Sequence, residues 1–306
     1  KIFSGEETSL FAKRELYVNW SKSKYKITKR GYSGLRNFGW HIYNGVDIVN
    51  QAYGWSAAEI DALISEAKSF PKFADSLYKK RMRESESTQW LEKTPANSAT
   101  FSFFLEQFDD SGIIHITRNP YDTVASLIAR GYDLYYAVGM YLLNTASGLA
   151  AMKSGKKYHL VKYEDLIHKP QETVSCICRF LDIKFSKSML SPQGETLAVS
   201  QLSGWQYDET ADIGRLSVGR FSSLAVESQD AIMEAFNMIK VNNRGLSYYM
   251  LNHDNVESLC STLEYDYYRL GSRKSANALK RSRNIDRFNR LRRGYASGIY
   301  YPLDII

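Results

Sequence analysis

The chain has 306 residues, of which 44% are hydrophobic and 24% charged, and its formal net charge is +7. This composition is typical of a globular protein, and no apolar run approaches the ~20 residues that a membrane-spanning helix needs. The three cysteines, Cys176, Cys178 and Cys260, are too few for a disulfide framework and lack the spacing of zinc ligands. We therefore expect reduced thiols, a cytoplasmic location and no metal site.

The N-terminal third predicts mostly helix. Apolar side chains recur at helical spacing over residues 56–83, where Ser56 suits the N-cap and Glu59 completes a capping box. Pro71 is expected to interrupt this helix. The other elements predicted in this part are a helix over residues 6–20, a short strand at 90–91 and a helix over 96–108.

The middle of the chain alternates strands with helices. Residues 112–117 predict a buried strand that ends at Arg118, and Asn119-Pro120 begins a helix that runs to residue 130. A helix over 134–153, a strand over 158–162 and a helix over 169–181 follow. This alternation predicts an α/β fold with a parallel sheet flanked by helices. Ligands of such sheets bind beyond the strand C-termini, where Lys93, Arg118 and Tyr163 all fall.

Arg118 and Ser126 form a candidate anion site. A guanidinium at the end of a strand, a hydroxyl on the following helix and the free N–H groups of a helix N-terminus suit a phosphate. The alternative is an ordinary strand–helix turn with a surface arginine.

Three segments together resemble the superfamily of sulfotransferases that use 3′-phosphoadenosine-5′-phosphosulfate (PAPS). They are Trp90-Leu-Glu-Lys-Thr-Pro-Ala-Asn97, Arg118-Asn-Pro-Tyr-Asp-Thr-Val-Ala-Ser126 and Leu160-Val-Lys-Tyr-Glu-Asp-Leu166. The resemblance continues through Pro170–Val174, Phe180–Ile183 and Ser217-Val-Gly-Arg-Phe221. It covers one domain over residues 1–271, similar to the tyrosylprotein and bacterial branches, and implies a P-loop-kinase-like sulfotransferase fold.

The resemblance implies a role for each matched residue. Lys93 would contact the transferring sulfuryl group, and Glu7, in Gly5-Glu-Glu-Thr8, would be the catalytic base. Glu92 is the alternative base. The cofactor-binding residues would be Arg118 and Ser126 at the 3′-phosphate, Tyr163 near the adenosine, and Arg220 on a loop that covers the cofactor. Asp122 is interpreted as a helix-capping group.

One family motif does not match. The phosphate loop of the Pro-Arg-Ser-Gly-Thr-Thr type should precede Lys1, so we expect that this numbering begins inside the domain. A permuted chain, with Gly271-Ser-Arg-Lys-Ser275 as the loop, is the alternative.

The predicted function is transfer of a sulfuryl group from PAPS to a hydroxyl acceptor, with adenosine 3′,5′-bisphosphate (PAP) as product. A small alcohol, phenol or glycan is favoured, since Ser9 replaces the arginine that tyrosylprotein enzymes carry for acidic peptides. A peptide tyrosine stays open. The alternative is a non-catalytic nucleotide-binding or interaction protein on a decayed sulfotransferase scaffold. A nucleoside kinase is disfavoured because no Gly-x-x-x-x-Gly-Lys-Ser/Thr sequence occurs.

Residues 272–306 are predicted as a basic C-terminal extension. They hold nine basic and two acidic residues, which account for the whole net charge of +7. The apolar spacing of Leu279, Ile285, Phe288 and Leu291 predicts an amphipathic helix packed on the domain. We therefore expect no nucleic-acid partner, although the charge leaves an anionic partner open. The sequence does not indicate an oligomeric state.

Overall fold

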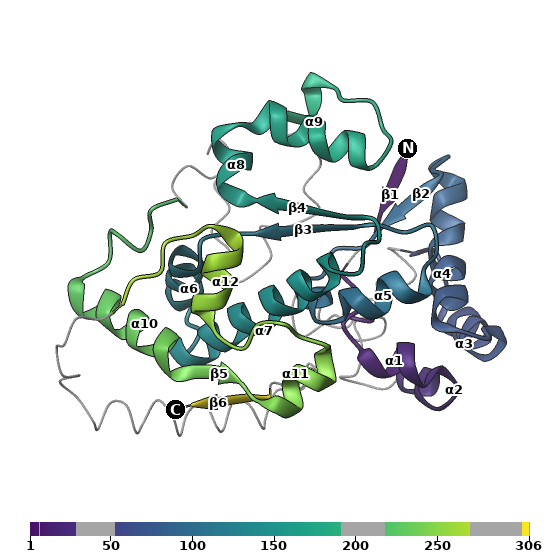
Figure 1. Cartoon of the computed structure of the whole chain (residues 1–306). Coiled ribbons are helices and arrows are strands. Elements are labelled where there is room, and N and C mark those ends of the chain that lie inside the picture. The colour runs from purple at the N-terminus through teal and green to yellow at the C-terminus, as the bar shows by residue number, and fades with distance from the viewer. Residues whose placement is uncertain (6, 29–52, 191–217, 270–301, 306) are drawn as a thin grey trace. The chain divides into compact units, whose positions relative to one another are not determined.

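The computed structural model describes residues 1–5, 7–28, 53–190, 218–269 and 302–305 (Figure 1). These residues form two compact units, one within Lys1–Ser111 and the other within Gly112–Tyr295 and Tyr300–Ile306, and each is described by itself. Helices and short strands make up both units, and the predicted α/β class is confirmed. Among the described helices, none is both long and apolar enough to cross a bilayer.

The first unit contains one parallel strand pair. β1 (Ile2–Ser4) runs alongside β2 (Gln89–Leu91), with Ser4 opposite Leu91. The residues that follow the two strands therefore leave from the same edge. The helices of this unit are α1 (Arg14–Val18), α2 (Trp20–Ser23), α3 (Ala57–Glu66), α4 (Phe70–Glu84) and α5 (Phe101–Gln107), with 3₁₀ turns at Lys24–Lys26 and Pro95–Thr100.

The predicted capping box at the start of α3 is confirmed. The N–H of Glu59 donates to Ser56 Oγ (3.3 Å), and the N–H of Ser56 donates to Glu59 Oε2 (2.7 Å). Pro71 lies in the first turn of α4, which Ser69 caps. Pro71 thus begins a second helix and explains why the helical pattern of residues 56–83 is divided in two.

An aromatic cluster forms the core of this unit. The ring of Phe11 lies 5.1 Å from that of Phe70 and 5.5 Å from that of Trp90. Trp90 stacks on Tyr78 with ring centroids 4.5 Å apart and nearly parallel planes. Because Trp90 is the middle residue of β2, this packing fixes the point at which Glu92 and Lys93 leave the core.

The predicted helix over residues 6–20 is wrong in its first half. Residues 7–13 form an irregular loop after β1, and helix begins only at Arg14; residue 6 lies outside the described part. The backbone N–H of Thr8 donates to the distant Glu92 carboxylate (3.0 Å), and Ser9 takes a left-handed conformation with φ of 55°. Tertiary hydrogen bonds therefore override the local helical pattern.

The second unit is built around the parallel pair β3 (Ile113–Thr117) and β4 (Tyr158–Lys162), with Thr117 opposite Lys162. Helix α7 lies on one side of the pair and α9 on the other (Figure 1). The remaining elements are α6 (Pro120–Ala129), α7 (Leu134–Met152), α8 (Tyr163–His168), α9 (Pro170–Phe180), a 3₁₀ turn at Lys187–Leu190, α10 (Val226–Met238), β5 (Ile239–Val241), α11 (Asn243–Tyr249), α12 (Val256–Leu263) and β6 (Leu303–Ile305).

His115 is a buried structural residue of β3. Its Nδ1 is 2.6 Å from Tyr158 OH, and its ring packs against Gly148 of α7, where a Cβ would lie 2.2 Å from the ring. Burial lowers the pKa of His115 to about 4. The ring is therefore neutral at neutral pH and serves as a packing element between β3 and α7.

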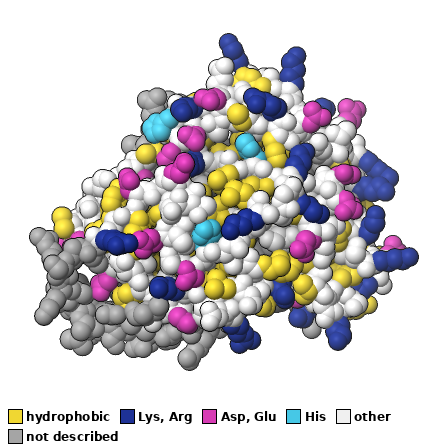
Figure 2. Space-filling view, viewed as in Figure 1, with side chains coloured by type: hydrophobic (Ala, Val, Ile, Leu, Met, Phe, Trp, Pro, Cys, Tyr) yellow, Lys and Arg dark blue, Asp and Glu magenta, His cyan; other side chains and the backbone are white. Residues whose placement is uncertain are grey.

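Most of the predicted basic extension lies outside the described residues. All of its basic residues and the predicted amphipathic helix lie outside the described part. So does Gly271–Ser275, the phosphate loop of the permuted alternative. The predicted domain boundary at residue 271 also falls there and stays a prediction. On the face shown in Figure 2, the positively charged side chains of the described residues are interspersed with negatively charged ones.

The end of the extension pairs with the second unit. β6 is antiparallel to β5, with Leu303 opposite Val241, and Leu303 is completely buried. Pro302 packs on Gly245, where a Cβ would lie 2.2 Å from the proline ring. The main chain of residues 302–305 is thus an integral part of this unit.

We expect Leu303→Ala to lower the free energy of unfolding by about 2–5 kcal/mol, because it removes a fully buried side chain and leaves a cavity. Asp304→Ala, at the exposed neighbouring position, is the control and should change stability much less. Urea unfolding monitored by circular dichroism measures both. Equal stability of Leu303→Ala and wild type would show that β6 contributes nothing.

Candidate active site

Arg118 lies at the junction between β3 and α6. Asn119 caps the helix, since its side-chain oxygen accepts hydrogen bonds from the N–H groups of Tyr121 (2.9 Å) and Asp122 (3.2 Å). Pro120 occupies the first turn, as the sequence predicts. The cap and the proline fix the direction in which the chain turns after Arg118.

Asp122 and Ser126 continue from Arg118 at intervals of four residues. On α6 this spacing puts Asp122 and Ser126 on one face, and both side chains are buried. Arg118 NH2 lies 3.9 Å from Asp122 Oδ2, and the arginine side chain is only 18% exposed. The two predicted 3′-phosphate residues thus belong to one strand–helix junction, with a carboxylate between them.

The parallel register brings Tyr163 to Arg118. Thr117 is opposite Lys162, so the next residues of the two strands emerge together. The guanidinium carbon of Arg118 lies 5.3 Å from the centre of the Tyr163 ring, within the range of a cation–π contact. The predicted proximity of these two residues at a strand edge is confirmed.

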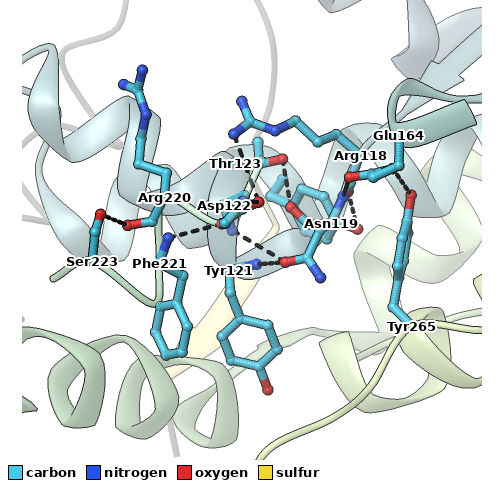
Figure 3. Close-up of polar contacts among 12 residues, drawn as sticks. Arg118, Asn119, Tyr121, Asp122, Thr123, Glu164, Arg220, Phe221, Ser223 and Tyr265 are labelled. Atoms are coloured by element: carbon cyan, nitrogen blue, oxygen red, sulfur yellow. Dashed lines mark hydrogen bonds and ion pairs between the residues drawn. The ribbon is translucent and has the colours of Figure 1, made fainter. Parts of the chain in front are cut away.

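Arg220 reaches the same region from a loop distant in sequence. The loop is held by Asp122, whose Oδ2 accepts from Gly219 N–H (2.7 Å) and whose Oδ1 accepts from Phe221 N–H (2.8 Å). Arg220 lies between these two residues in the chain, and in Figure 3 its side chain extends to the same side as that of Arg118. Ser217, the first residue of this predicted motif, lies outside the described part.

The electrostatics of Arg118 reflect this arrangement. Burial lowers the pKa of Arg118, Asp122 and Tyr163 raise it, and the neighbouring cation of Arg220 lowers it. Two guanidinium groups that repel each other at a partly buried position are stabilised by an anion that binds between them. The arrangement therefore suits a multiply charged oxyanion such as a phosphate.

Sequence reasoning missed the role of Glu164. Its Oε1 accepts from Asn119 N–H (2.8 Å), and its Oε2 accepts from Tyr265 OH (2.8 Å) (Figure 3). Glu164 thus ties the start of α6 to α8 and to the segment after α12. Its place directly after Tyr163 in a matched motif was the available signal, whereas nothing in the sequence singled out Tyr265.

The first unit holds the predicted catalytic pair. Glu7 follows β1 and Lys93 follows β2, and because these strands are parallel the two side chains meet: Lys93 Nζ forms an ion pair with Glu7 Oε1. The side chain of Lys93 is 68% exposed and that of Glu7 is 42% exposed. Both groups are accessible to a substrate.

Glu92, the alternative base, is in a different environment. Its Oε1 accepts from Thr8 N–H (3.0 Å), Thr8 Oγ1 (3.1 Å) and Thr94 Oγ1 (2.6 Å), and its Oε2 accepts from Asn97 Nδ2. Burial raises the pKa of Glu92, and these hydrogen bonds oppose that rise. Glu92 therefore connects the loop that carries Glu7 to the segment that carries Lys93.

Within the described ranges, no three or more His, Cys, Asp or Glu side chains are grouped so that they could hold a metal ion. The polar groups that the structure assembles are two cationic clusters with carboxylate partners, one in each unit.

Comparisons with known proteins give one family-model match and a similarity of fold. The model of the sulfotransferase family (Sulfotransfer_3) matches residues 49–187. The sulfotransferase domain from the Synechococcus PCC 7002 olefin synthase is similar in structure, with a TM-score of 0.53 and 15% identity over 87% of this chain and 95% of that chain. The sulfotransferase domain from the curacin biosynthetic pathway has a TM-score of 0.45 and 15% identity, over 87% and 98% of the two chains. No curated protein matches this chain.

Proposed function

The chain belongs to the sulfotransferase superfamily, and we propose that it transfers a sulfuryl group from PAPS to the hydroxyl group of an acceptor. The observation that carries the donor assignment is the pair of guanidinium groups, Arg118 and Arg220, on one side of a capped helix start. This cluster suits the 3′-phosphate that distinguishes PAPS from ATP. Ser126 on the same helix would add a hydroxyl donor, and the Tyr163 ring would lie beside the adenosine.

Glu7 and Lys93, which form an ion pair, would be the catalytic residues. In the transfer, the bond between sulfur and the phosphate oxygen of PAPS breaks and a bond from sulfur to the acceptor oxygen forms. Glu7 would take the proton of the acceptor hydroxyl, and Lys93 would stabilise the negative charge that develops on the leaving phosphate. Adenosine 3′,5′-bisphosphate (PAP) is then the second product. Glu92, which already accepts four hydrogen bonds, would hold the two loops in place.

The acceptor proposed is a small alcohol, a phenol or a glycan. Ser9 supports this choice, because it stands where the tyrosylprotein branch carries an arginine for acidic peptides. A peptide tyrosine is the competing acceptor. A panel of small hydroxyl compounds and tyrosine peptides, assayed for PAP release, separates them. Cys176, Cys178 and Cys260 are free thiols, which supports a reducing, cytoplasmic location.

Isothermal titration with PAP and with ADP tests the donor assignment. The two ligands carry the same number of phosphates but differ in whether one is attached at the 3′ position. A clear preference for PAP is expected from the Arg118 cluster. Binding of neither ligand would contradict the proposal and favour a non-catalytic protein, and a preference for ADP would indicate a different nucleotide reaction.

We expect Arg118→Ala to weaken PAP binding about ten- to a hundredfold, because a charge-assisted hydrogen bond contributes ~1.5–3 kcal/mol. Arg130, an exposed arginine at the other end of α6, gives the matched control. Arg130→Ala removes the same charge from the same helix and should leave PAP affinity nearly unchanged. Equal losses in both variants would indicate a general charge effect and not a site at Arg118.

A further inference from the structure

Asp122 was interpreted from the sequence as a helix-capping group, but the residue that caps α6 is Asn119, and Asp122 binds a distant loop instead. Its two carboxylate oxygens accept the N–H groups of Gly219 (2.7 Å) and Phe221 (2.8 Å), 97 and 99 residues away in sequence. These two bonds flank Arg220 on either side. The side chain of Asp122 is 7% exposed, so water competes little with these bonds.

The loop is also fixed by its apolar residue. The Phe221 ring packs 4.8 Å from Tyr121, the neighbour of Asp122 on α6, and 6.1 Å from Tyr268 in a parallel stack. Gly219 has a positive φ of 80°, which lets the chain turn toward Asp122. Backbone hydrogen bonds and ring packing together leave Arg220 as the residue that projects from the turn (Figure 3).

We propose that Asp122 is a positioning residue that sets the Arg220 guanidinium beside Arg118 for a 3′-phosphate. This inference rests on the proposed function, since the ligand is the phosphate that distinguishes PAP. Asp122 itself would not touch the ligand. Its carboxylate is a negative charge close to Arg118, so by charge alone it opposes anion binding. The role that we assign to Asp122 is therefore to hold the loop that carries Arg220.

The two effects of Asp122 predict opposite results for Asp122→Asn. If the carboxylate acts mainly by its charge, the variant binds PAP more tightly than wild type. If it positions the loop, the variant binds PAP more weakly, because an amide cannot accept both N–H groups. We expect weaker binding, by about tenfold, and little change for adenosine 5′-phosphate, which lacks the 3′-phosphate.

A double-mutant cycle with Arg220→Ala separates positioning from general damage. In the Arg220→Ala background, the loop has no guanidinium to place, so Asp122→Asn should cost less than about twofold in PAP affinity. A residue that merely stabilises the fold would cost the same in both backgrounds, and that result would overturn the proposal. Tighter or unchanged binding by Asp122→Asn would also overturn it. If wild type does not bind PAP at all, the proposed function fails instead.

Asp133 supplies a matched control. It caps α7 by accepting the N–H groups of Tyr135 (3.1 Å) and Tyr136 (3.4 Å), so it is an aspartate with two backbone bonds within its own helix. Asp133→Asn should leave PAP affinity near that of wild type.

If Asp122→Asn does not fold, amide hydrogen exchange on the wild-type protein tests the same proposal. The amides of Gly219 and Phe221 should be protected, and more so with PAP bound. Fast exchange at both positions with PAP present would overturn the proposal.

Discussion

Replacing Glu7 with Gln is expected to lower kcat about 10²–10⁴-fold while PAP affinity stays within about twofold of wild type. Glutamine keeps the size of the side chain but cannot take the proton of the acceptor hydroxyl. Glu7 is 42% exposed and paired with Lys93, so its loss should leave the fold intact. Steady-state kinetics at saturating PAPS and acceptor, beside PAP titration, measure the two effects.

Two other carboxylates serve as controls for Glu7. Glu84 forms an exposed ion pair with Arg81 (2.6 Å), and Glu84→Gln should leave kcat unchanged. Glu92→Gln should lower thermal stability, because an amide nitrogen cannot accept the bonds that the carboxylate accepts. If Glu7→Gln keeps a near-normal kcat while Glu92→Gln loses it in a stable protein, Glu92 is the base and the assignment is wrong.

Replacing Lys93 with Ala is expected to lower kcat about 10²–10³-fold, with a much smaller loss of PAP affinity. The reason is that Lys93 would meet negative charge that develops only as the bond to sulfur breaks, so its effect falls on the transition state more than on binding. Pre-steady-state measurement of PAP formation reports the chemical step directly.

Lys79→Ala, at an exposed lysine of α4, is the control for Lys93 and should behave as wild type. Lys93→Arg keeps the cation and should recover part of the lost rate. Normal turnover of Lys93→Ala would exclude a role in the reaction. An equal loss in kcat and in PAP affinity would instead indicate that Lys93 mainly binds the product.

Local sequence patterns predicted the strand–helix junctions well. The end of β3 before Arg118, the start of α6 at Pro120 and the end of β4 before Tyr163 follow from apolar runs and a proline. The α3 capping box was equally local. These features depend on residues a few positions apart, so they can be predicted without the tertiary structure.

Long-range contacts explain what the sequence did not predict. Residues 7–13 were wrongly predicted as helix. The hydrogen bond that holds them in a loop joins Thr8 to Glu92, 84 residues away, and a local sequence pattern does not reveal it. Asp122 was interpreted as a cap from its position near the start of the helix. Its hydrogen bonds to Gly219 and Phe221, 97 and 99 residues away, could not be predicted from local sequence. β6 is three residues long, too short for a periodic signal, and it follows a strongly basic segment.

β6 meets β5 through only three residue pairs, and two strands of that length do not associate as separate peptides. The covalent connection through residues 270–301 therefore sets the effective concentration at which β6 finds β5. A single cleavage of the chain between Arg269 and Pro302 would therefore make the pairing of β6 with β5 bimolecular.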